Sequence, residues 1–268
     1  MSGALMRRTL VGAALAVSAA GCGVSTQQEV QLGQDYASQI NAQLPIVEDG
    51  EINRYINVLG DSIARLSDDR DLDWTFYVVN SKEVNAFAVP GGFIYINRGL
   101  IERAANLSQL AGVLGHEIAH VTERHSIEAM QKSQTANIGV TLACVLLKAC
   151  GDAVTQTAIN VAGGAYFARH SRQAESESDA QAVRYVMRAG IHPQGIPQMF
   201  RTLLDERQRS PSGVEAWFST HPLEEDRIEH TTALINQVDD AILLTLTVDT
   251  ENFQAFKRRV SSLPVVAG

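Results

Sequence analysis

The sequence predicts an α+β fold that is mainly helical and contains one small antiparallel sheet. Several segments space their apolar residues three and four positions apart, which is typical of amphipathic helices. Between Trp74 and Ile96 the period changes to two, which is typical of strands. No internal repeat or low-complexity linker interrupts the 268 residues, and 45% of them are hydrophobic. This composition is sufficient for a large core, so one compact domain is favoured.

Two helices and three strands are predicted in the first hundred residues. The helices cover Val24 to Leu44 and Glu51 to Leu66, where apolar residues recur on one side. Alternating residues predict a strand at Trp74 to Val79 and shorter strands at Ala86 to Val89 and Phe93 to Ile96. A Pro-Gly-Gly break separates the last two, because neither residue type continues a strand.

The rest of the chain is predicted to be helical apart from one loop and one strand. The sequence predicts helices at Asn106 to Gln131, Asn137 to Gly164 (one or two), Ala165 to Ala189, Gly195 to Arg209, Leu223 to Val238 and Asn252 to Leu263. The segment Ser210 to Gly213 is predicted to be a loop because it is rich in Ser, Pro and Gly. Leu243 to Val248 alternates and predicts a strand.

The first 21 residues are predicted to be a lipoprotein signal peptide. Arg7 and Arg8 form a basic start, and the apolar stretch from Thr9 to Ala20 is too short to span a bilayer. Small residues lead directly to Cys22, which resembles the lipobox of bacterial lipoproteins, so acylation of Cys22 is expected. Gly23 in place of Asp fits retention in the outer membrane. The resemblance implies a protein anchored by lipid to the periplasmic face of a bacterial outer membrane.

The net charge bears on nucleic-acid binding, and the other two cysteines bear on disulfide formation. The formal net charge is −8 without a long run of either sign, which argues against nucleic acid as a partner. Export would place Cys144 and Cys150 in an oxidising compartment, where a disulfide can form. A spacing of six on a continuous helix would hold the thiols too far apart, so a bond requires a break, for which Gly151 lies close. The alternative is two buried free thiols.

The strongest chemical motif is His-Glu-Ile-Ala-His, from His116 to His120, inside a predicted helix. Residues four apart lie on one helix face, so both imidazoles can reach a single metal ion, expected to be zinc. Glu117 lies about 100° further round, where its carboxylate can act as general base on a zinc-bound water. The flanking residues are apolar and indicate burial, and buried polar groups need partners.

A third protein ligand is expected from the acidic segment that follows. On a helix the face of Glu175 continues through Asp179 into an apolar stripe, whereas the face of Glu177 continues into solvated residues. Glu175 is therefore predicted to be the ligand, and Asp179 to accept a hydrogen bond from a ligand histidine. His125 lies five residues after His120 and about 140° away on a continuous helix, so it is predicted to be structural.

Four motifs together resemble metallopeptidase family forty-eight, including its LoiP-like and BepA-like envelope members. They occur in order between Glu48 and Val238, at Asn85 to Gly92, His116 to His120, Ser171 to Asp179 and Ser219 to Pro222. The resemblance implies a zincin-like metalloprotease domain in which Glu175 and Asp179 form the Glu-x-x-x-Asp motif. It also implies that His221 faces the zinc, either as a transition-state donor or as a switch that occupies the open position. Arg227 can pair with a carboxylate near the site.

The chain is predicted to consist of four parts. These are the signal peptide at 1–21, a lipidated tether and N-terminal helix at 22–47, the zinc metallopeptidase domain at 48–240, and a C-terminal strand and helix at 241–268 packed on the same domain. Neither a tetratricopeptide array nor a transmembrane span is predicted, unlike in some members of the family.

The resemblance implies a zinc endopeptidase with one Zn²⁺ per chain, Glu117 as general base and His221 as a second catalytic group. Unfolded or misfolded envelope proteins are the expected substrates, and the N-terminal lipid is the expected link to the membrane. The strand Phe93 to Ile96 is expected to present an edge to which an extended substrate adds. The alternative is a non-catalytic or normally auto-inhibited zinc lipoprotein that assists envelope assembly; retention of Glu117 counts against the non-catalytic form.

Overall fold

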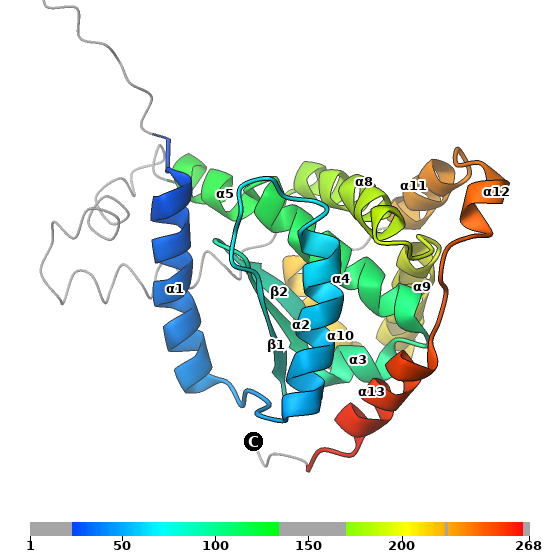
Figure 1. Ribbon diagram of the computed structural model, residues 1–268, viewed down its shortest axis with the longest axis horizontal. Helices are drawn as coiled ribbons and strands as arrows, with labels where there is room; N and C mark the ends of the chain where they lie inside the picture. Colours follow the sequence, from blue (N-terminus) through cyan, green and yellow to red (C-terminus); the bar gives the residue numbers. More distant parts are fainter. Residues whose placement is uncertain (1–22, 134–169, 223–224, 265–268) are drawn as a thin grey trace, which may run out of the picture.

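A computed structural model describes residues 23–133, 170–222 and 225–264 (Figure 1). The predicted signal peptide, Cys22, the cysteines Cys144 and Cys150, and the helices expected at 137–164 lie outside these residues. The described part is mainly helical with one small sheet, so the predicted fold class is confirmed. Within it, no helix has the length and apolar character needed to cross a bilayer.

The sheet contains three strands, β1 (Thr75–Val79), β2 (Ala86–Val89) and β3 (Phe93–Asn97), in the order β1-β3-β2. β3 pairs antiparallel with β2 but parallel with β1, so the sheet is mixed and not antiparallel throughout. Gly91 and Gly92, with φ of 81° and 98°, form the tight turn between β2 and β3. The longer connection from β1 carries the chain past β3, and a period of two does not reveal such a crossover.

Helices cover both faces of the sheet (Figure 1). α1 (Thr26–Gln43) and α5 (His125–Ser133) pack on one face around Tyr95, whose ring stacks against Phe87 with centroids 4.8 Å apart. α2 (Gly50–Ala64) and α4 (Leu107–Thr122) pack on the other face, onto Ile94 and Ile96. Successive strand residues point to opposite faces, which explains why one strand serves two apolar clusters.

α4 is the central helix of the molecule, because every residue from Leu107 to Val121 is buried. It packs against α2, the sheet, α8 (Arg172–Arg188) and α9 (Gly195–Arg209). A helix enclosed on all sides can carry buried polar groups only where its neighbours supply partners. The other described helices are α3 (Arg98–Arg103), α10 (Pro211–Thr220), α11 (Glu225–Ile235), α12 (Asp240–Leu243) and α13 (Glu251–Ser261).

Three local predictions are wrong. The helix expected from Asn106 to Gln131 ends at Thr122 and a new helix begins at His125, because Arg124 adopts a φ of 57°. The loop expected at 210–213 is the first turn of α10, where Pro211 suits a helix start. The strand expected at 243–248 is absent: α12 and a turn occupy it, and only Thr247 forms a bridge, with Ile191.

A buried carboxylate ties α1 to the break between α4 and α5. Glu29 of α1 is fully buried, and Arg124 donates to its Oε2 from Nε at 2.7 Å. Arg70 also contacts both oxygens of Glu29, at 3.4 Å, and donates to the backbone oxygen of Val121 near the end of α4. Arg124 further donates to the backbone oxygen of Val24. One anion thus holds two cations and three segments together.

Replacing Glu29 by Gln should destabilise the fold, since Arg70 and Arg124 would lose their shared anion. The free energy of unfolding, measured by urea denaturation, should fall by about 2–3 kcal/mol. Asp35→Asn is the matched control, because Asp35 lies exposed on the same helix and should change stability by less than about 0.5 kcal/mol. Equal losses in the two variants would contradict a structural role for the Glu29 cluster.

Candidate metal centre

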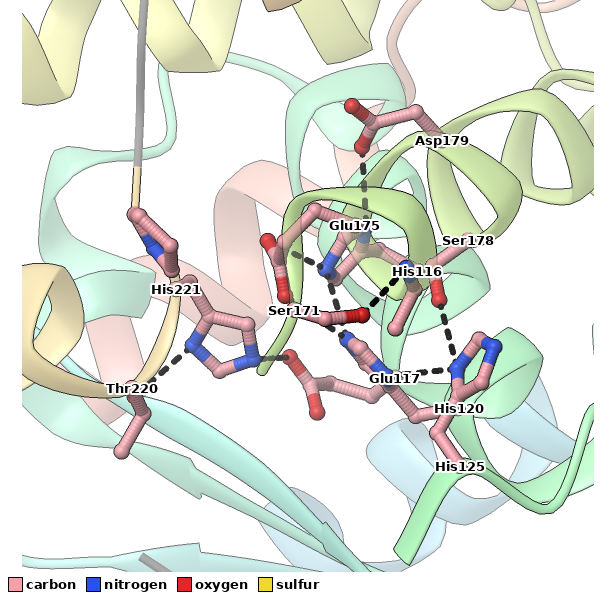
Figure 2. Close-up of polar contacts among 12 residues, drawn as sticks. His116, Glu117, His120, His125, Ser171, Glu175, Ser178, Asp179, Thr220 and His221 are labelled. Atoms are coloured by element: carbon pink, nitrogen blue, oxygen red, sulfur yellow. Dashed lines mark hydrogen bonds and ion pairs between the residues drawn. The ribbon is translucent and has the colours of Figure 1, made fainter. Parts of the chain in front are cut away.

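α4 supplies three buried polar side chains, His116, Glu117 and His120, each with about 1% of its surface exposed. One helical turn separates the two histidines, so their rings meet edge to face with centroids 4.7 Å apart. Their Nε2 atoms are 3.0 Å apart and point to the same place (Figure 2). Glu117 extends to one side of this pair, toward His221.

α8 brings two carboxylates against these histidines. Oε2 of Glu175 lies 3.6 Å from Nε2 of His116, and its Oε1 lies 3.4 Å from Nε2 of His120. Oδ1 of Asp179, one turn later, lies 2.9 Å from Nδ1 of His116. Ser171 caps α8 by accepting from the Ala174 N–H, which fixes where the helix begins.

Arg227 on α11 holds both carboxylates. Its Nε and Nη2 donate to the two oxygens of Asp179, each at 2.7 Å, and its Nη1 donates to Oε2 of Glu175. Nη1 also donates to the backbone oxygen of Pro222 at 3.0 Å, which ties the segment after His221 to the same cation. This fork geometry is one that arginine supports and lysine does not.

His221 completes the group from the end of α10. Its Nδ1 lies 2.9 Å from Oγ1 of Thr220, its ring stacks on Trp217 with centroids 4.5 Å apart, and its Nε2 lies 3.4 Å from Oε1 of Glu117. The structure therefore brings together one buried cluster of His116, Glu117, His120, Glu175, Asp179, His221 and Arg227.

Two further histidines contact His120 and were not assigned to the site from the sequence. The ring of His170, just before α8, stacks on the ring of His120 with centroids 3.9 Å apart. Nδ1 of His125 lies 3.0 Å from Nδ1 of His120. The only sequence signal for His170 is its place directly before the acidic segment. The sequence places His125 away from the site because it assumes one continuous helix, but that helix ends at Thr122.

Burial and neighbouring charges shift several pKa values in the cluster. Burial raises the pKa of Glu117 to about 7, against the opposing effects of His116 and of the Ala88 backbone N–H in β2. Burial alone would lower the pKa of His116, but the carboxylates of Asp179 and Glu175 outweigh it and raise that pKa to about 9. Burial lowers the pKa of His120 and His221, so both imidazoles are neutral at pH 7.

The cluster has the composition of a metal site. His116, His120, Glu175 and His221 each offer a ligand atom, and these atoms lie within 4.8 Å of one another. Oε1 of Glu175, both oxygens of Glu117 and Nε2 of His221 are buried without a well-formed hydrogen bond. A cation at the centre of the donor set would satisfy such groups, so these residues fit a bound metal.

Comparisons with known proteins agree with this geometry. A family model described as Peptidase family M48 matches residues 48–235. The beta-barrel assembly-enhancing protease of Escherichia coli strain K12 is 31% identical over 250 residues, which are 90% of this chain and 50% of that protein. A putative protease of the same name from Vibrio cholerae is 33% identical over 215 residues, 78% of this chain and 44% of that protein.

A shorter relative is the metalloprotease YcaL of E. coli K12, which is 29% identical over 159 residues, 58% of this chain and 59% of that protein. The chain spans about half the length of the assembly-enhancing proteases it matches. The family match includes α4, α8, α10 and α11, which supply the site residues. The family predicted from the motifs is confirmed: the chain belongs to peptidase family M48, whose members are metal-dependent endopeptidases.

Proposed function

We propose that the protein is a zinc-dependent endopeptidase of the bacterial cell envelope that hydrolyses peptide bonds in unfolded or misfolded proteins. The observation that carries the proposal is the buried donor set of His116, His120 and Glu175, with Glu117 beside it, in a chain of peptidase family M48. Relatives named beta-barrel assembly-enhancing protease support an envelope role. The lipobox-like pattern at Cys22 supports anchoring at the outer membrane, on its periplasmic face.

His116, His120 and Glu175 are the residues that would hold zinc. Two imidazole nitrogens and one carboxylate, with a further position free, form a donor set typical of catalytic zinc. Asp179, 2.9 Å from Nδ1 of His116, would keep the proton of that ring away from Nε2. When bound, zinc supplies a Lewis acid that polarises the scissile carbonyl and lowers the pKa of the attacking water.

Glu117 is proposed as the general base. A buried carboxylate with a pKa of about 7 can take a proton from the attacking water and then return it to the leaving amine. His221, with Nε2 3.4 Å from Oε1 of Glu117, is placed to donate to the oxyanion that develops on the carbonyl. Arg227 holds Glu175 and Asp179 in position through charge-assisted hydrogen bonds.

Substrate is proposed to add as a strand to β2. The strand at 93–97 cannot present the edge expected from the sequence, because β3 is the central strand of the sheet. The N–H of Asn97 donates to the oxygen of Asn85, and hydrogen-bonded pairs alternate along an antiparallel ladder. The backbone N–H and C=O groups of Ala86 and Ala88 therefore point away from β3, toward the side where Glu117 lies. Main-chain pairing there would select extended, unfolded chains.

The second candidate is a peptidase that is normally auto-inhibited. His221 offers a ligand atom to the same donor set as His116 and His120, and its side chain is equally buried, with 1% exposed. Atoms this deeply buried are not accessible to a substrate in this conformation. A resting state in which His221 takes the free metal position is consistent with this arrangement.

Glu117→Gln should keep zinc and lose activity, because the side chain is a base and not a ligand. Casein hydrolysis should fall by roughly a hundred- to ten-thousand-fold. Zinc content, measured by atomic absorption on the same preparation, should stay at one ion per chain. Turnover at the wild-type rate in a zinc-loaded Glu117→Gln protein would exclude the proposed mechanism.

Glu175→Ala should weaken zinc binding by more than roughly a hundred-fold. Loss of a residue that only hydrogen-bonds to a ligand costs up to about that much, and loss of a ligand should cost more. Glu177→Ala is the matched control, two residues away on the same helix. Its carboxylate is 48% exposed and contacts His125 and no histidine of the donor set, so its effect should stay below about ten-fold. The measurement is the zinc dissociation constant of each variant, obtained by chelator competition. A larger loss of zinc affinity in Glu177→Ala than in Glu175→Ala would assign Glu177 as the ligand.

If the second candidate is right and His221 takes the free metal position at rest, His221→Ala should raise the basal rate on an unfolded substrate, because the substitution frees that position. The initial rate on casein, with zinc content checked in both proteins, provides the measurement. A fall of roughly ten- to thousand-fold would instead assign His221 as an oxyanion donor. An unchanged rate with full zinc would exclude both roles.

A further inference from the structure

His125 lies against the proposed zinc site although it belongs to a different helix from His116 and His120. It is the first residue of α5 and is only 4% exposed. Its ring centroid is 5.1 Å from that of His120, and the two Nδ1 atoms are 3.0 Å apart. In Figure 2 a dashed line joins the two rings on the side of His120 that faces away from His116. This contact involves the ring nitrogen that His120 does not direct at the donor set.

The positions of the protons follow from the geometry. Nε2 of His120 must be unprotonated to bind a metal, so its proton is on Nδ1 and needs an acceptor. The nearest ring nitrogen is Nδ1 of His125, which can accept only if the proton of His125 is on Nε2. That Nε2 lies 3.2 Å from Oε2 of Glu177, a carboxylate that accepts. One tautomer of each ring therefore satisfies both contacts.

A serine also lies at this contact. Oγ of Ser178, which is fully buried, lies 3.3 Å from Nδ1 of His125. His116 has Asp179 as its outer partner on α8, whereas none of the described contacts gives His120 a carboxylate or carbonyl partner at Nδ1. The two ligand histidines thus differ in what orients them.

The break between α4 and α5 is what places His125 there. Five positions along a continuous helix would turn His125 about 140° away from His120. The φ of 57° at Arg124 ends α4 and changes the direction of the chain into α5, and the contacts of Arg124 with Glu29 and the Val24 backbone hold that conformation. A non-glycine residue with positive φ costs free energy, so its presence beside a functional group is informative.

We propose that His125 is a positioning residue of the zinc site, which accepts the Nδ1 proton of His120 and thereby keeps Nε2 of that ring free for the metal. The inference rests on the proposed function, because it concerns the same site. His125 would act through His120 and touch neither metal nor substrate.

Three substitutions in the full-length protein separate this role from packing. His125→Asn places an amide oxygen near the position of Nδ1 and keeps an acceptor for His120. His125→Gln extends past that position toward Glu177, and His125→Leu offers no acceptor at all. Zinc dissociation constants from chelator competition should rise by roughly ten- to a hundred-fold for the Gln and Leu variants and by less than about three-fold for the Asn variant.

The pattern across variants decides the outcome. A packing role would instead penalise the shorter Asn most, and that order, or unchanged zinc affinity in His125→Leu, would overturn the inference. If the Leu variant fails to fold, as judged by circular dichroism, the comparison of Asn with Gln still discriminates. Glu175→Ala measured alongside separates the two proposals: if wild-type protein binds zinc no more tightly than Glu175→Ala, the proposed function fails as well. If the wild type binds zinc tightly and His125→Gln has the same zinc dissociation constant, only the proposed role of His125 is refuted.

Discussion

The guanidinium of Arg227 is the interaction on which the rest of the site depends. Glu175 and Asp179 are almost completely buried, and two adjacent buried carboxylates would repel each other and lose their hydration. Arg227 compensates for both with three charge-assisted hydrogen bonds and lies over the ring of Phe200 at 4.6 Å. Buried ion pairs are seldom a net gain in stability, so the value of this one lies in geometry. It aligns α8 with the histidines of α4 and joins both to the segment that carries His221.

Where one helix contains the whole pattern, the sequence indicated which side chains lie close together. The spacing of His116 and His120 is a property of α4 alone, and the choice of Glu175 over Glu177 followed from the faces of α8, one buried and one solvated. The structure puts Glu175 beside the histidines and Glu177 at the surface. Such inferences need only the helical period, which a sequence displays directly.

Prediction failed where tertiary contacts decide the local structure. The positive φ of Arg124 depends on Glu29, which is nearly a hundred residues earlier, and no local signal marks a helix end there. The parallel pairing of β1 with β3 depends on which way the chain crosses, not on the alternation within either strand. The proximity of His170 to His120 likewise depends on how α8 packs on α4.

The placement of the donor set on two helices has a consequence for when the donor set forms during folding. His116 and His120 are translated before Glu175, and α8 must pack against α4 before the three donors converge. Contacts between distant segments form late in folding, since closing a long loop costs entropy that only native packing repays. A chain that has folded only its N-terminal half carries two histidines and no complete cage for an ion. The complete donor set is thus a property of the finished fold, and a copy that is still folding cannot hold an ion with all three donors.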